Sequence, residues 1–193
     1  LMSIIPASVP APVLPRRRQL LFGTMFVSAA VAMFEFSLVA AYLAERAGKR
    51  NVWLTENSIP LTQPNMQFAA LILGSIFVQW AVWAIARNER GQAYLALGCT
   101  AVMAAAFLNQ TTFLWQRVGM TMAQAEGPFF YALTGANFAF IALALGFILL
   151  MAFRAFGGQY SARLPDGISA AALFWHVNVA LYAVVWLAVY IMK

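Results

Sequence analysis

The chain has 193 residues, of which 63% are hydrophobic and 9% are charged, and its formal net charge is +6. A soluble domain is typically about a quarter charged, so this composition excludes a soluble fold and indicates a protein whose solvent is lipid. The basic residues lie in short connections between apolar runs, where membrane orientation signals are found, so nucleic-acid binding is not expected.

Taken in chain order, the sequence reads as a short tail and five apolar segments. Residues 1–19 contain four prolines and three consecutive arginines, and we interpret them as an irregular tail on the membrane surface. The apolar segments that follow are each long enough to cross a hydrocarbon core about 30 Å thick, and they lie at about 20–43, 66–86, 92–115, 129–153 and 170–192. Because backbone polar groups cannot stay unpaired in lipid, each should be helical. The predicted fold class is all-α: an integral membrane bundle of five transmembrane helices in a single domain, residues 20–193.

The distribution of Lys and Arg predicts the orientation of the chain. Seven of these residues lie on the amino-terminal side and five on the other, and three of the seven directly precede the first span. Positive charge next to the first span usually stays in the cytoplasm. We therefore expect the N-terminus in the cytoplasm and the C-terminus on the periplasmic or extracellular side.

Polar residues inside the spans are costly, so each is either satisfied structurally or used. Glu35 is the only carboxylate within a span, and it shares one helical face with Thr24, Ser28 and Tyr42, which should face other helices. One interpretation is a proton-accepting or regulatory carboxylate. The other, which we favour, is a protonated Glu hydrogen-bonded within the bundle.

The depths of the other polar residues predict two clusters. Asn137 and the polar run at 109–112, which includes Gln110, should lie near the depth of Glu35 in the outer half. Gln79, His176 and Asn178 should lie in the inner half, although His176 and Asn178 are about 200° apart on their helix. The simplest purpose of both clusters is to hold helices together.

The sequence predicts no catalytic, metal-binding or cofactor-binding residue in this chain. His176 is the only histidine and Cys99 the only cysteine, so bis-histidine haem ligation and Cys-rich metal sites are excluded. A hydrolase would need a nucleophile–base pair, yet Glu35 and His176 are predicted at different depths. A transporter would need a continuous polar pathway, inverted repeats or broken helices, none of which is evident. Quinone binding stays open.

Five stretches, in order on the five spans, carry a family resemblance. They are Met-Phe-Glu-Phe-Ser-Leu-Val-Ala-Ala-Tyr at 33–42, Pro-Asn at 64–65, Phe-Leu-Asn-Gln at 107–110, Phe-Phe-Tyr-Ala-Leu-Thr-Gly at 129–135 and Phe-Trp-His-Val-Asn at 174–178. Together they resemble subunit III of cytochrome c and quinol oxidases, in its short five-helix bacterial form. Of the family's buried ionisable set, His176 alone keeps its place. The other positions carry different residues, at Val31, Phe113, Asn137, Phe140 and Asn178.

The resemblance implies a non-catalytic accessory subunit of a haem-copper terminal oxidase in a bacterial plasma membrane. Such a subunit packs against the catalytic subunit I, beside subunit II, stabilises it and supports its proton uptake in aerobic respiration. Haem and copper are then expected in the partner subunits, and phospholipid along grooves of this chain. The small residues at 101–106 and 135–146 predict a face that allows close docking.

Two alternatives remain at this point. The chain could be an accessory subunit of a nitric oxide reductase-type complex, or a small membrane transporter. The sequence does not distinguish cytochrome c from quinol as the electron donor, or oxygen from nitric oxide as the acceptor, since these choices belong to partner subunits.

Overall fold

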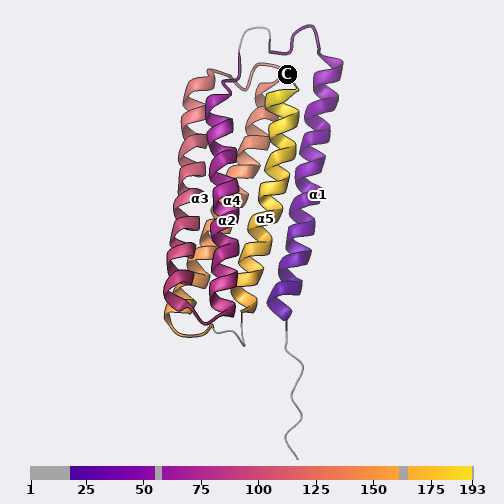
Figure 1. Ribbon diagram of the computed structural model, residues 1–193. Helices are drawn as coiled ribbons and strands as arrows, with labels where there is room; N and C mark the ends of the chain where they lie inside the picture. The colour runs from indigo at the N-terminus through magenta and orange to yellow at the C-terminus, as the bar shows by residue number, and fades with distance from the viewer. Residues whose placement is uncertain (1–17, 55–57, 161–164, 193) are drawn as a thin grey trace, which may run out of the picture.

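Five helices make up the computed structural model, which describes residues 18–54, 58–160 and 165–192 (Figure 1). They are α1 (Gln19–Gly48), α2 (Thr62–Ala86), α3 (Arg90–Val118), α4 (Gly127–Phe156) and α5 (Asp166–Val185), and a π-helical segment, Trp186–Ile191, continues α5. All five are long and apolar enough to cross a membrane, and the described ranges contain no strand. The predicted all-α bundle of five transmembrane helices is confirmed.

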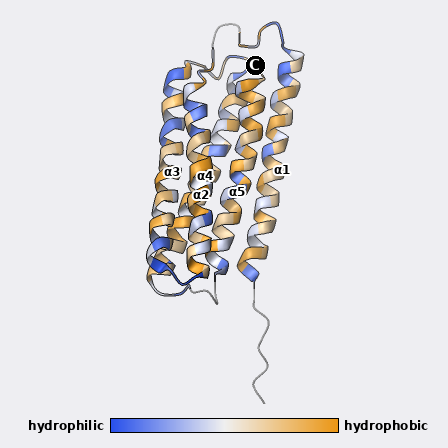
Figure 2. Ribbon diagram, viewed as in Figure 1, coloured by the Kyte–Doolittle hydropathy of each residue, from blue (hydrophilic) through white to orange (hydrophobic). Residues whose placement is uncertain are grey.

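The helices extend beyond the predicted spans at most of their ends. Hydropathy marks only the part of a helix that faces hydrocarbon, whereas the helix continues into the polar interface. The end of α1 is an example, because Lys49 Nζ lies 2.8 Å from a Glu45 carboxylate oxygen there. Figure 2 shows hydrophilic residues gathered towards the two ends of the bundle. The predicted tail lies almost wholly outside the described residues, and Gln19 already begins α1.

Four of the helices form a closed ring, and α1 packs on its outside. In the ring α2 packs on α3, α3 on α4, α4 on α5, and α5 returns to α2. The remaining helix, α1, packs chiefly against α5 and α4, and Figure 1 shows it at one edge of the bundle beside α5. The face of α1 predicted from the spacing is the one that packs, because Thr24, Ser28, Glu35 and Tyr42 are all buried.

Short connections fix which helices are antiparallel neighbours. Only residues 87–89 separate α2 from α3, and Asn88 takes a left-handed backbone with φ 60° in that turn. At the other end of α3 the helix stops at Gly119, whose φ is 63°. This conformation is strained for a residue with a Cβ and free of strain for glycine, so Gly119 ends α3 cleanly.

The closest approach in the bundle joins α2 to α5. The Trp175 side chain is 0% exposed, and its indole N–H donates to the Leu71 carbonyl oxygen at 3.3 Å. A Cβ added at Gly74 would overlap the six-membered ring of Trp175. The missing side chain at Gly74 therefore lets a tryptophan fit between two helices, as small residues do in many membrane bundles.

The connection between α4 and α5 is held by a buried tyrosine. The Tyr160 hydroxyl donates to the Met151 sulfur at 2.9 Å. Burial raises the pKa of the Tyr160 phenol, an effect that the positive charge of Arg154 partly offsets. The phenol therefore stays protonated at neutral pH and keeps its donor role.

Candidate functional site

Glu35, the only carboxylate within the spans predicted from the sequence, bonds to the amide predicted to lie at its depth. Glu35 is 1% exposed, and Asn137 Nδ2 donates to its Oε1 at 2.5 Å. The same amide donates to the Leu133 carbonyl oxygen of its own helix at 3.0 Å. The second oxygen, Glu35 Oε2, is buried with no hydrogen-bond partner in the described part of the chain. This pair joins α1 to α4.

A second hydrogen-bonded group lies close to this pair and braces three helices. Gln67 Nε2 of α2 donates to Thr111 Oγ1 of α3 at 2.7 Å, and the Tyr182 hydroxyl of α5 donates to Gln67 Oε1 at 2.7 Å. These three residues and Asn137 lie around one narrow gap that has no room for a water molecule. The two groups therefore face one interior space.

Only part of this second hydrogen-bonded group was predicted from the sequence. In the run at 109–112 the buried member is Thr111, whereas Gln110 is half-buried and Asn109 and Thr112 are exposed. Gln67 was missed because it is a single polar residue one turn after Pro64, close to the predicted start of its span. Tyr182 was missed because it reads as one more aromatic residue in an apolar run.

The second predicted group forms in part. His176 Nε2 lies 3.3 Å from Gln79 Oε1, and His176 Nδ1 lies 3.2 Å from Ser75 Oγ. Ser75 was not predicted, since serine in a helix gives no periodic pattern of its own. Asn178 lies apart from this pair: it is buried and donates to the Phe174 carbonyl oxygen of its own helix at 2.8 Å.

These arrangements are suited to holding helices together. Glu35–Asn137, Gln67–Thr111 and Gln79–His176 each join two helices through uncharged or singly ionisable partners. No group of three or more His, Cys, Asp and Glu side chains gathers within the described ranges. The prediction that haem and copper lie in partner subunits remains a prediction.

The Glu35–Asn137 bond gives a direct stability test. In a double-mutant cycle with Glu35→Ala and Asn137→Leu, we expect a coupling free energy of about 1 kcal/mol, the usual size of a hydrogen bond between transmembrane helices. The measurement is unfolding of the purified chain in mixed detergent micelles. The control cycle pairs Glu35→Ala with Asn178→Leu, which should be additive because Asn178 bonds within its own helix. Equal coupling in both cycles would contradict the role of this bond.

Comparison with known proteins identifies the family of this chain. The model of the family described as cytochrome c oxidase subunit III matches residues 19–193, which include all five helices. The chain belongs to the cytochrome c oxidase subunit III family. The resemblance carried by the five short stretches is confirmed.

Individual relatives of the subunit III family are distant. The cytochrome c oxidase subunit 3 of Synechocystis is 26% identical over 176 residues, which are 89% of this chain and 75% of that protein. A probable cytochrome c oxidase subunit 3 of Rickettsia bellii is 26% identical over 174 residues, 86% of this chain and 60% of that protein. That of Struthio camelus is 25% identical over 132 residues, 68% of this chain. The chain spans 51% of the Struthio protein, about half its length.

Proposed function

We propose that this chain is the non-catalytic subunit III of a haem-copper terminal oxidase in a bacterial plasma membrane. The family match over residues 19–193 carries the proposal. In this role the chain packs against the catalytic subunit I, beside subunit II, stabilises the complex and supports proton uptake by subunit I during aerobic respiration. Haem and copper belong to the partner subunits.

The polar interior supports a scaffold role. Four of the buried polar side chains in the spans, Glu35, Gln67, Asn137 and Asn178, hydrogen-bond to other helices or to their own backbone. Such groups stabilise a rigid bundle, which a partner subunit can use as a fixed surface. Among the described residues these bonds form separate groups, whereas a transporter needs a continuous polar pathway.

Phospholipid is the expected small-molecule partner. A groove of about 940 Å³ runs between α1, α4 and α5, with an apolar wall that includes Val27, Leu143 and Phe147. Its polar end carries Arg154, whose Nε donates to Gln159 Oε1 at 2.8 Å. An acyl chain along the wall with its phosphate near Arg154 would satisfy both ends of the groove.

The orientation forms part of the proposal. The N-terminus is cytoplasmic and the C-terminus is periplasmic or extracellular, because three consecutive arginines directly precede the first span and such positive charge usually stays in the cytoplasm. The part of the chain that the structure describes has five candidate spans, an odd number, and the start of α1 and the end of the segment that continues α5 lie at opposite ends of the bundle (Figure 1).

Purification through a tag on this chain tests the proposal. We expect haem-bearing subunits to co-purify in mild detergent and to give a reduced-minus-oxidised haem spectrum, with oxygen consumption by the purified complex. An unrelated tagged multi-pass protein from the same membranes, which should bring down no haem, is the control. A haem-free chain that runs alone in several mild detergents would contradict the proposal and favour a transporter. A complex that reduces nitric oxide instead of oxygen would assign the chain to that class of reductase.

A further inference from the structure

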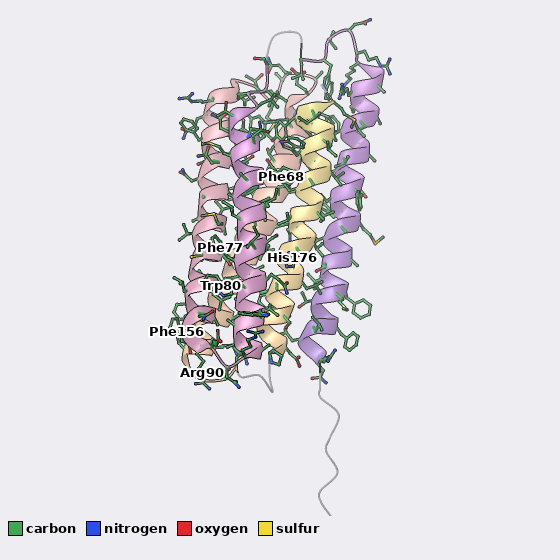
Figure 3. All side chains as sticks on the ribbon, viewed as in Figure 1. Phe68, Phe77, Trp80, Arg90, Phe156 and His176 are labelled. Atoms are coloured by element: carbon green, nitrogen blue, oxygen red, sulfur yellow. The ribbon has the colours of Figure 1, made fainter. Side chains whose placement is uncertain are left out.

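A hollow on the outer face of the bundle lies where α2 and α5 meet. It has a volume of about 590 Å³ and is lined by one face of α2 and by the only histidine of α5, namely Ile72, Ser75, Ile76, Gln79, Trp80, Trp83 and His176. We call this surface the Gln79 face. Figure 3 labels His176 on α5, with Trp80 lower in the view.

The hydrogen bonds within the Gln79 face leave one group without a partner. With Gln79 Oε1 opposite His176 Nε2, the tautomer that fits both contacts carries its hydrogen on Nε2 and accepts from the Ser75 hydroxyl at Nδ1, which is an assignment from the hydrogen-bond network. These contacts use both ring nitrogens and the serine hydrogen. The Gln79 Nε2 amide, with two hydrogens to donate, has no partner within the described residues, and Gln79 is exposed.

The unpaired amide lies at the depth of the hydrocarbon core. Gln79 is five residues from the midpoint of α2, Thr62–Ala86, which corresponds to about 7 Å along the axis. Half of a hydrocarbon core is about 15 Å thick, so the amide lies well inside it. An acyl chain offers no hydrogen-bond acceptor, so a polar side chain that faces outward at this depth needs a polar partner.

The surroundings of Gln79 are already ordered. The Trp80 indole N–H donates to Gln92 Oε1 of α3 at 3.2 Å, and the Arg87 guanidinium lies 3.7 Å from the centre of the Trp83 ring. Residues 72–83 cover three turns of α2, about 16 Å, and present side-chain ridges of the kind that pack into the grooves of another helix. The face is therefore a fixed, ridged surface with a hydrogen-bond donor inside it.

We propose that the Gln79 face docks a transmembrane helix of the catalytic subunit that places a hydrogen-bond acceptor against the Gln79 amide. The inference rests on the proposed function and adds to it the contact face, which differs from the small-residue faces at 101–106 and 135–146 expected from the sequence. A helix is the occupant because it supplies both the acceptor and the side chains that fill the hollow between Ile76, Trp80 and His176. Asn109 is also exposed, but it presents one amide on α3, whereas three polar side chains from two helices meet at the Gln79 face.

Photo-crosslinking in the intact complex tests the docking face. A photoreactive amino acid is placed at Ile76 in the Gln79 face, or at Leu143 on the small-residue face of α4; these side chains are 60% and 62% exposed. We expect the Ile76 probe to crosslink to the catalytic subunit and the Leu143 probe to crosslink to lipid. Crosslinking to the catalytic subunit from Leu143 and not from Ile76 would overturn the inference while leaving the proposed function in place. Failure of the unsubstituted chain to co-purify with a haem-bearing subunit would overturn both.

A matched pair of substitutions tests the hydrogen bond itself. Gln79→Leu is expected to lower the amount of catalytic subunit retained through a detergent wash by about fivefold, whereas Asn109→Leu is expected to leave it unchanged. Both variants replace an exposed amide with leucine, and their helical content and thermal unfolding are checked first. Loss with Asn109→Leu and not with Gln79→Leu would place the docking face on α3 and overturn the inference.

Discussion

Replacing Trp175 with alanine is expected to lower the free energy of unfolding by about 3–5 kcal/mol, the largest effect of any single substitution considered for this chain. The indole is fully buried between α2 and α5 and donates to the Leu71 carbonyl oxygen. Its removal leaves a cavity at the closest approach of two helices and a carbonyl oxygen without this donor. In lipid the loss falls mainly on van der Waals packing, because that is what joins transmembrane helices.

The measurement for Trp175→Ala is unfolding of the purified chain in mixed detergent micelles, followed by circular dichroism and tryptophan fluorescence. Trp83→Ala is the matched control, since the Trp83 side chain is 47% exposed and its removal leaves no cavity. It is expected to shift the free energy of unfolding by less than about 1 kcal/mol. Equal losses in the two variants would show that Trp175 has no special part in joining α2 to α5.

A methyl group added at Gly74 is expected to destabilise the chain, although alanine is the better helix former. The added Cβ overlaps the Trp175 ring, so one of the two helices must shift. Overpacking of this kind typically costs about 1–3 kcal/mol. The expected result for Gly74→Ala is therefore a lower midpoint of unfolding in the same micelle assay.

The control for Gly74→Ala is Gly98→Ala on α3. No heavy atom lies within 4 Å of a Cβ added at Gly98, so this variant is expected to gain up to about 1 kcal/mol from helix propensity. The two substitutions are chemically identical and should shift stability in opposite directions. Trp175→Phe in the Gly74→Ala background should recover part of the loss, because a smaller ring leaves room for the methyl group. Destabilisation by both glycine substitutions would refute the packing argument.

The number and class of the helices could be predicted from the sequence, but their neighbours could not. Each span is recognisable alone because its hydropathy is a local property. The packing of α1 on α4 and α5 depends on residues more than 100 positions apart, such as Glu35 and Asn137. Nothing in the local pattern around Glu35 specifies whether its face meets α2 or α4.

The polar contacts also divide into those that could be predicted from the sequence and those that could not. Glu35, Asn137, Gln79 and His176 were found because each is an unusual residue in an apolar run, and comparison of depths paired them as the structure does. Gln67 and Tyr182 meet across 115 positions, and neither is unusual where it stands. Polar pairs of this kind become visible only when the rotation of both helices about their axes is known.

The position of α1 outside the ring has a consequence for how the chain is made. Glu35 leaves the ribosome 102 residues before Asn137, its hydrogen-bond partner. At typical bacterial synthesis rates that interval lasts about 5–20 seconds. During this interval α1 has neither α4 nor α5 to pack against. The Glu35 carboxyl group in the middle of α1 then faces the surroundings of the newly inserted helix and not Asn137. Until Asn137 has been synthesised, the Glu35 carboxyl group therefore needs another hydrogen-bond partner.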